Sequence, residues 1–231
     1  MTNQKTLDAI AIMPNNGEPP KYLLLMLHGW GANYQDLAPL AQMLNLPDFG
    51  FLFPNAPFKH PQMPGGRAWY DLENMPHCKQ LTVSRELLIN WLSSLEAKTG
   101  VPLERTIMAG FSQGGAMTLD VGLTFPLLGL CSMSGYLHYE PEDNALAKVD
   151  ERSLIIETED INRSYPSKLS PTLIVHGKQD PVVPIAAAKQ AKEKLNAIGV
   201  EVEYHEFDMG HEIPMPVLDV LQKFIDSVSG L

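Results

Sequence analysis

The 231-residue sequence predicts an α/β fold with a mostly parallel central sheet and helices on both faces. The first observation is a set of short, continuous apolar runs, such as residues 22–27 and 172–177, which are typical of strands covered on both faces. The second is that segments with helical spacing alternate with these runs, which implies right-handed crossovers between parallel strands. The third is length. Chains of this size often form one α/β domain, so we expect residues 1–231 to be a single domain.

Composition and charge exclude several classes of partner. The chain carries 17 Lys and Arg against 27 Asp and Glu, a formal net charge of -10, which argues against a nucleic-acid or anionic-membrane partner. No apolar run approaches the roughly 20 residues that a membrane-spanning helix needs, and the N-terminus leads into no long apolar segment. We therefore expect a cytoplasmic protein with no integral membrane association.

The two cysteines, Cys78 and Cys131, cannot form a disulfide framework, and no Cys/His pair has the spacing of a zinc site. Cys131 lies within an apolar run and is expected to be a small buried hydrophobe. Cys78, beside His77 and Lys79, has the more reactive surroundings, although we favour a loop cysteine without a catalytic role. We expect neither a cofactor nor a metal.

The elements follow from apolar periodicity. The expected strands, in chain order, are residues 7–12, 22–27, 51–54, 105–109, 127–133, 172–177 and 200–207, with the last close to an edge of the sheet. The expected helices cover residues 36–46, 81–98, a stretch beginning near 115, 185–198 and 217–228. Asp36 is a candidate N-cap, and Gly100 and Gly199 are candidate C-terminal stops.

Two long segments do not fit this alternation. Residues 55–77 are rich in Pro and Gly yet carry several large apolar side chains, so this loop should cover either the core or a ligand. Trp69 in this loop could pack in the core or form a substrate-facing wall. Residues 136–170 are polar and acidic around a few aromatics, and residues 153–157 could be a strand or a short helical turn. We expect this excursion to be a lid or a contact in a homodimer.

The stretch Gly110-Phe111-Ser112-Gln113-Gly114 lies between a strand-like run and the start of a helix. A serine with glycines two residues before and after it, at such a junction, fits a nucleophile elbow. The turn would hold Ser112 in a strained conformation, and larger side chains at either glycine would crowd it. The alternative is a glycine-rich turn with an incidental serine, and the motif alone does not decide between them.

Two later loops supply the partners that a serine nucleophile needs. Asp180 follows the expected strand at 172–177, and His211 follows the one at 200–207. Because parallel strands place their carboxyl ends at one edge, Ser112, Asp180 and His211 are expected to meet there. His211 would take the serine proton and Asp180 would orient the imidazole. The chain order serine, acid, histidine is that of the α/β-hydrolases.

Other residues compete for these roles. His211 is the one histidine of seven that combines a post-strand loop, a preceding glycine and a position after the acid. His28 is expected to be structural. Asp208 is a rival acid, but it lies on the same loop as His211.

The tetrahedral intermediate also needs hydrogen-bond donors for its oxyanion. The expected donors are the backbone amides of Gln113, which follows the nucleophile, and of Trp30, in the loop after residues 22–27. Gly29 and Gly31 let the backbone of that loop approach a ligand closely. The alternative for this loop is a simple turn at the end of a strand.

Five motifs follow one another along nearly the whole chain. They are Leu27-His28-Gly29-Trp30-Gly31, Gly65-Gly66-Arg67-Ala68-Trp69-Tyr70-Asp71, Gly110-Phe111-Ser112-Gln113-Gly114-Gly115, His176-Gly177-Lys178-Gln179-Asp180-Pro181-Val182-Val183-Pro184 and Gly210-His211. Together they resemble the phospholipase/carboxylesterase family, which includes acyl-protein thioesterases and small bacterial carboxylesterases. The resemblance implies an α/β-hydrolase fold and a triad of Ser112, Asp180 and His211.

The first hypothesis is therefore a cofactor-free serine carboxylesterase that acts on a small-molecule or lipid-like ester with a short- to medium-chain acyl group. Trp69, Val183 and loop methionines would wall its acyl pocket. Ala32 stands where the thioesterase branch usually has an acidic residue, which looks more like the bacterial esterase branch. The alternatives are a lysophospholipase or acyl-protein thioesterase and, from another class, a non-catalytic scaffold that binds an acyl ligand and would not need all three triad residues.

Overall fold

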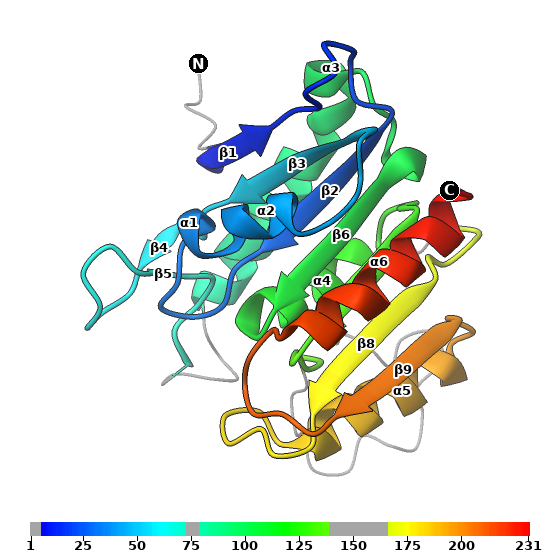
Figure 1. Ribbon diagram of the computed structural model, residues 1–231. Helices are drawn as coiled ribbons and strands as arrows, with labels where there is room; N and C mark the ends of the chain where they lie inside the picture. The colour runs from blue at the N-terminus through cyan, green and yellow to red at the C-terminus, as the bar shows by residue number, and fades with distance from the viewer. Residues whose placement is uncertain (1–5, 73–78, 139–165) are drawn as a thin grey trace.

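The structure, a computed structural model, describes residues 6–72, 79–138 and 166–231. A seven-stranded sheet with the order β1-β3-β2-β6-β7-β8-β9 forms its centre (Figure 1). The strands are β1 (Ala9–Ile12), β2 (Tyr22–Leu27), β3 (Phe49–Pro54), β6 (Thr106–Phe111), β7 (Gly129–Met133), β8 (Thr172–Gly177) and β9 (Val202–Phe207). Within this sheet β1 pairs antiparallel with β3, and the other neighbouring strands pair parallel. The mostly parallel sheet and the edge position of β9 are confirmed.

Helices cover both faces of this sheet, as predicted. They are α1 (Tyr34–Leu37), α2 (Lys79–Ser93), α3 (Leu95–Thr99), α4 (Gln113–Gly122), α5 (Ile185–Ala197) and α6 (Met215–Ser229), with short 3-10 helices η1 (Ala38–Gln42) and η3 (Leu103–Arg105). Figure 1 shows α6 in front of the sheet and α4 and α5 behind it. Both layers exclude water from the sheet, which explains why its strands read as continuous apolar runs.

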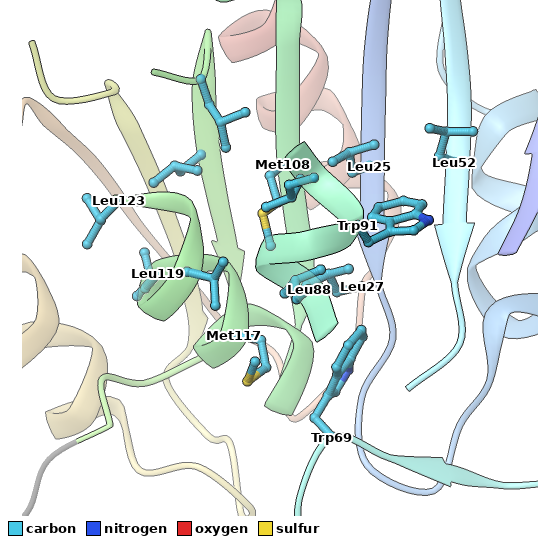
Figure 2. Packing of buried hydrophobic residues seen from close by; sticks show 14 of the residues in the cluster. Leu25, Leu27, Leu52, Trp69, Leu88, Trp91, Met108, Met117, Leu119 and Leu123 are labelled. Carbon is cyan, nitrogen blue, oxygen red and sulfur yellow. The ribbon is translucent and has the colours of Figure 1, made fainter. Parts of the chain in front are cut away.

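The alternation of side chains along β2 shows how the two cores divide. Leu25 and Leu27 belong to the cluster that packs against α2, α4 and α5, whereas Leu24 and Met26 belong to the cluster that packs against α6. Figure 2 shows part of the first cluster, in which the ring of Trp69 points toward the side chains around Leu27. Successive residues of a strand thus enter opposite cores.

The helix predicted at 36–46 is shorter in the structure, and the one predicted at 81–98 is divided into two helices. Asn33, not Asp36, is the N-cap of α1, because its side chain accepts from the Gln35 amide at 2.8 Å while Asp36 accepts from the Asn33 amide at 2.8 Å. Pro39 lacks an amide donor, and the chain continues there as a 3-10 helix. The second helix breaks at Ser94 into α2 and α3 and ends at Gly100, whose φ of 74° confirms the expected glycine stop.

A two-stranded hairpin lies within residues 55–77, which were expected to be a loop. Its strands are β4 (Phe58–Lys59) and β5 (Arg67–Ala68). Strands of two residues are too short to produce a readable alternation of side chains. The hairpin is joined to the loop after β2 by the bonds Gly31 N to Arg67 O and Arg67 N to Ala32 O, both 2.8 Å.

The expectations for Cys78, for the excursion at 136–170 and for membrane-spanning helices depend on which residues the structure describes. Cys78 and residues 139–165 lie outside them, and with the latter most of the excursion that was expected to be a lid or an interface. None of the described helices has both the length and the apolar composition needed to cross a bilayer. The carboxyl ends of β2, β6, β8 and β9 are described, and these ends carry the candidate site.

Candidate active site

Ser112 occupies a sharp turn between the end of β6 and the start of α4. Its φ of 55° and ψ of -118° are values that a residue with a side chain rarely adopts. A Cβ at Gly110 would meet the Gly114 carbonyl, and one at Gly114 would meet the carbonyls of Leu27 and His28. The glycines on both sides of the serine are therefore required by close backbone approach, which is the geometry of a nucleophile elbow.

Asp180 and His211 meet at the same edge of the sheet, on the loops after β8 and β9. His211 Nδ1 lies 2.7 Å from Asp180 Oδ2, while the amides of Val182 and Val183 each donate to Asp180 Oδ1 at 2.8 Å. Burial raises the pKa of the Asp180 carboxyl, but the hydrogen bonds from His211, Val183 and Val182 outweigh it, so its pKa lies below the ordinary value. The carboxylate is thus ionised at neutral pH and can fix the tautomer of the imidazole.

His211 also lies beside the elbow. Its ring contacts that of Phe111, the residue before the nucleophile, with 4.7 Å between the centroids. The rival acid Asp208 points to solvent, with a side chain 76% exposed, and pairs with Lys178 at 3.0 Å. Asp180, by contrast, has a fully buried side chain. The partner of His211 in this structure is therefore Asp180.

His176, at the end of β8, supports the acid loop, a role that the sequence did not reveal. Its Nε2 lies 2.8 Å from the Val183 carbonyl and 3.6 Å from Asp180 Oδ2. Because a carbonyl only accepts, Nε2 carries the proton and donates to it. The side chain is completely buried, so this bond is protected from water and ties the acid loop to the sheet. The available signal was its place in a buried strand, four residues before the acid.

The loop after β2 passes directly against the nucleophile. A Cβ added to Gly29 would lie 3.3 Å from the Cβ of Ser112. Within the described residues, the backbone N–H groups of Trp30 and Gln113 donate to no protein acceptor. The Gln113 amide is at the N-terminus of α4, where the helix dipole favours negative charge. Both amides therefore remain the candidates for oxyanion donors.

His28 holds this loop in place, as expected of a structural residue. Its Nε2 accepts from the Ala56 amide at 3.0 Å, and its Nδ1 lies 2.8 Å from the Gly29 carbonyl, to which it donates. Burial lowers the pKa of His28 to about 4, because a charged imidazole would lose its hydration. The ring is thus neutral at physiological pH, as its one acceptor nitrogen requires.

The contacts of Trp69 correspond to the core alternative and not to a substrate-facing wall. Its side chain is completely buried, and its indole Nε1 donates to the His28 carbonyl at 3.0 Å. Val183, the other expected wall residue, is 7% exposed, and its backbone serves Asp180 and His176. The sequence could not separate these alternatives for Trp69, because an aromatic residue in a loop suits both.

The remaining expectations concern the cysteines and metal binding. Cys131 is free and completely buried, and burial raises the pKa of its thiol far above the ordinary value, as expected of an inert side chain. Residues 6–72, 79–138 and 166–231 contain no group of three or more His, Cys, Asp or Glu side chains able to hold a metal ion.

Comparison with known proteins agrees with this geometry. A family model described as Phospholipase/Carboxylesterase matches residues 8–229. Acyl-protein thioesterase 1 of Saccharomyces cerevisiae is 30% identical over 236 residues, which cover 90% of this chain and 93% of the yeast protein. The crystal structure of esterase PE8 matches with a TM-score of 0.80 at 30% identity, over 97% of this chain and 100% of that one. Acyl-protein thioesterase 2 of Zea mays, 21% identical with a TM-score of 0.68 over 96% of this chain and 98% of its own, supports the fold alone.

Proposed function

Because the chain belongs to the phospholipase/carboxylesterase family and is a serine hydrolase, we propose that it cleaves short- to medium-chain carboxylic esters with Ser112 as the nucleophile. The observation that carries this assignment is the 2.7 Å contact between His211 Nδ1 and the buried Asp180, at the sheet edge that also bears the strained Ser112. A hydrogen-bonded acid and imidazole beside a serine elbow is the arrangement that activates a hydroxyl for acyl transfer.

The reaction follows from these positions. Ser112 Oγ attacks the ester carbonyl carbon while His211 takes its proton, and the amides of Trp30 and Gln113 bind the resulting oxyanion. Collapse of this intermediate breaks the bond to the alcohol, which leaves with the proton from His211. Water then attacks the acyl-enzyme, with His211 again as the base, and releases the carboxylic acid. Asp180 stays ionised throughout and stabilises the imidazolium.

Replacement of the nucleophile tests this proposal. We expect Ser112→Ala to lower turnover of p-nitrophenyl butyrate by at least about 10⁴-fold, with an unchanged circular dichroism spectrum. The matched control is Ser93→Ala, which changes an exposed serine of α2 whose hydroxyl donates to the Ile89 carbonyl of the same helix. Full turnover by a folded Ser112→Ala protein would contradict the assignment.

Acyl-protein thioesterase or lysophospholipase activity is the second candidate, and the name of the 30% identical yeast relative favours the thioesterase. Oxygen esters and thioesters carry the same acyl group, so one chain-length series prepared in both forms ranks the alternatives. We expect the highest kcat/KM for oxygen esters of short or medium length. A maximum at long acyl thioesters would assign the thioesterase instead.

We also propose that the protein is cytoplasmic, that it forms a homodimer and that residues 136–170 form a lid. These proposals are supported by the sequence patterns alone. Cell fractionation tests the first and sedimentation velocity the second. Deletion of residues 141–164, which lie between the described ends of the segment, tests the third through the chain-length preference.

A further inference from the structure

A buried hydrogen-bond network that takes no part in the triad joins α2, α4 and the loops after β5 and β7. Arg85 Nε donates to Asp120 Oδ2 at 2.6 Å, and His138 Nδ1 lies 2.9 Å from the same oxygen. The hydroxyl of Tyr70 lies 2.7 Å from His138 Nε2 and 2.6 Å from the hydroxyl of Tyr136. The side chains of Arg85, Asp120 and His138 are almost inaccessible, at 2%, 1% and 4% exposed.

The donors and acceptors define one direction along this network. An ionised Asp120 carboxylate only accepts, so His138 Nδ1 carries the proton and donates to it. His138 Nε2 then accepts from the Tyr70 hydroxyl, whose oxygen accepts from Tyr136. Burial, the largest effect, and the neighbouring Tyr136 raise the pKa of Tyr70 well above its ordinary value, so its hydroxyl keeps its proton at neutral pH. The Asp120–His138–Tyr70 relay therefore holds the Tyr70 ring at one position.

The backbone of Tyr70 is bound in turn by the residue that follows the nucleophile. Gln113 Nε2 donates to the Tyr70 carbonyl at 2.8 Å, and Gln113 Oε1 accepts from the Trp69 amide at 2.9 Å. The Gln113 side chain is buried, so water does not compete for either bond. Because these bonds and the amide facing the site belong to one residue, the position of the 69–70 backbone constrains that amide.

The same backbone segment is connected to the second donor loop. Trp69 Nε1 donates to the His28 carbonyl at 3.0 Å, two residues before Trp30. Ser84 Oγ of α2 donates to the Trp69 carbonyl and fixes the segment from its other side. Residues 69 and 70 thus bond to Gln113 and to His28, which lies on the loop that carries Trp30.

We propose that the Asp120–His138–Tyr70 relay positions the oxyanion hole, with Tyr70 as a positioning residue that acts through Gln113 and Trp69. This inference rests on the proposed function, because it assumes that the amides of Gln113 and Trp30 bind the oxyanion. Donors aimed at charge that develops during the reaction stabilise the transition state more than the substrate. Loss of the relay should therefore lower kcat and leave KM nearly unchanged.

Two tyrosine variants form a matched pair for the test. Tyr70→Phe removes the hydroxyl that bonds to His138, whereas Tyr136→Phe removes a hydroxyl that bonds only to Tyr70 among the described residues. His138→Asn breaks the relay from the opposite side, because the shorter side chain can face Asp120 but cannot reach Tyr70. It decides the test by the same measurements if Tyr70→Phe does not fold.

The measurements are kcat and KM for p-nitrophenyl butyrate, the melting temperature, and the inhibition constant of a trifluoromethyl ketone with the same acyl chain. The serine adds to the ketone carbonyl and passes its proton to His211, so the adduct carries an oxyanion. We expect Tyr70→Phe and His138→Asn to lower kcat about tenfold and to weaken the inhibitor by a similar factor, with KM within about twofold of wild type. Tyr136→Phe should keep kcat and inhibition within about twofold.

Three results would contradict the positioning role of the relay and leave the proposed function intact. One is a lower melting temperature in both relay variants with unchanged kcat and inhibition, which would mean that the network only stabilises the fold. Another is a higher KM with unchanged kcat. The third is an equal loss in Tyr136→Phe, which leaves the bond to His138 in place. By contrast, a wild-type protein that neither cleaves the ester nor binds the ketone would overturn the proposed function and this inference together.

Discussion

Ser112 adopts a backbone conformation that costs a residue with a side chain about 1–3 kcal/mol and persists only where its surroundings enforce it. Two bonds do so here, from the Ser112 amide to the Met133 carbonyl at 2.8 Å and from the Ala116 amide to the Ser112 carbonyl at 3.0 Å. The glycine spacing predicted this turn from the sequence. The supports of the neighbouring loops, such as His176 and the side chain of Gln113, follow no local pattern, because their partners are distant in the chain.

The burial of His28 predicts that the free energy of unfolding depends on pH. The pKa of His28 is lowered from 6.5 to about 4 in the folded protein, so between these values the unfolded chain binds the additional proton. The stability that the neutral His28 ring contributes is fully present above pH 6.5 and is lost as the pH falls toward 4. The total loss is up to about 3 kcal/mol in the free energy of unfolding. Urea unfolding of His28→Gln should therefore show a smaller loss of unfolding free energy than wild type between pH 6.5 and 4.

The control for this prediction is His205→Gln, since His205 is a histidine of β9 whose side chain is 38% exposed. A change of slope in His28→Gln beyond that in His205→Gln is then due to burial of the imidazole. An identical slope in wild type and His28→Gln would show that the buried imidazole is not the group that makes folding sensitive to acid.

Helices and strands whose apolar pattern runs over many residues were predicted well. Elements that depend on a few hydrogen bonds were not. The strands of the central sheet and the helices α4, α5 and α6 match their apolar patterns within a few residues. The hairpin β4–β5 was missed, because its pairing with the loop after β2 depends on backbone groups and not on side-chain type. The break at Ser94 was missed for a related reason, since its hydroxyl bonds to the Trp91 carbonyl inside a continuous apolar stripe.

The capping box of α1 predicts how substitutions of Asn33 change the stability of the protein. Asn33 ends the loop that carries Trp30, and its side chain satisfies an amide that has no partner within the helix. We expect Asn33→Ala to lower the free energy of unfolding by about 1 kcal/mol, measured in urea at pH 7. Asn33→Ser should restore most of this loss, because serine is also a good N-cap. Equal stability of all three proteins would mean that the cap contributes nothing.

For the whole molecule, the parallel sheet explains why residues far apart in the sequence act together. β6, β8 and β9 end at the same edge, so the loops that bear Ser112, Asp180 and His211 meet there. The alternation of apolar runs and helical segments predicted the fold, and the positions of Asp180 and His211 after two of the expected strands predicted that they would meet. The acyl pocket could not be predicted to the same degree, because the type of a loop residue such as Trp69 suits both a pocket wall and the core.

The most direct test of the central claim is to map a fluorophosphonate adduct by mass spectrometry, because this reagent phosphonylates an activated serine far faster than an ordinary one. At neutral pH we expect one adduct per chain, on the peptide that contains Ser112, and none in Ser112→Ala. An unmodified wild-type protein, or an adduct of equal yield in Ser112→Ala, would contradict the assignment of Ser112 as the nucleophile.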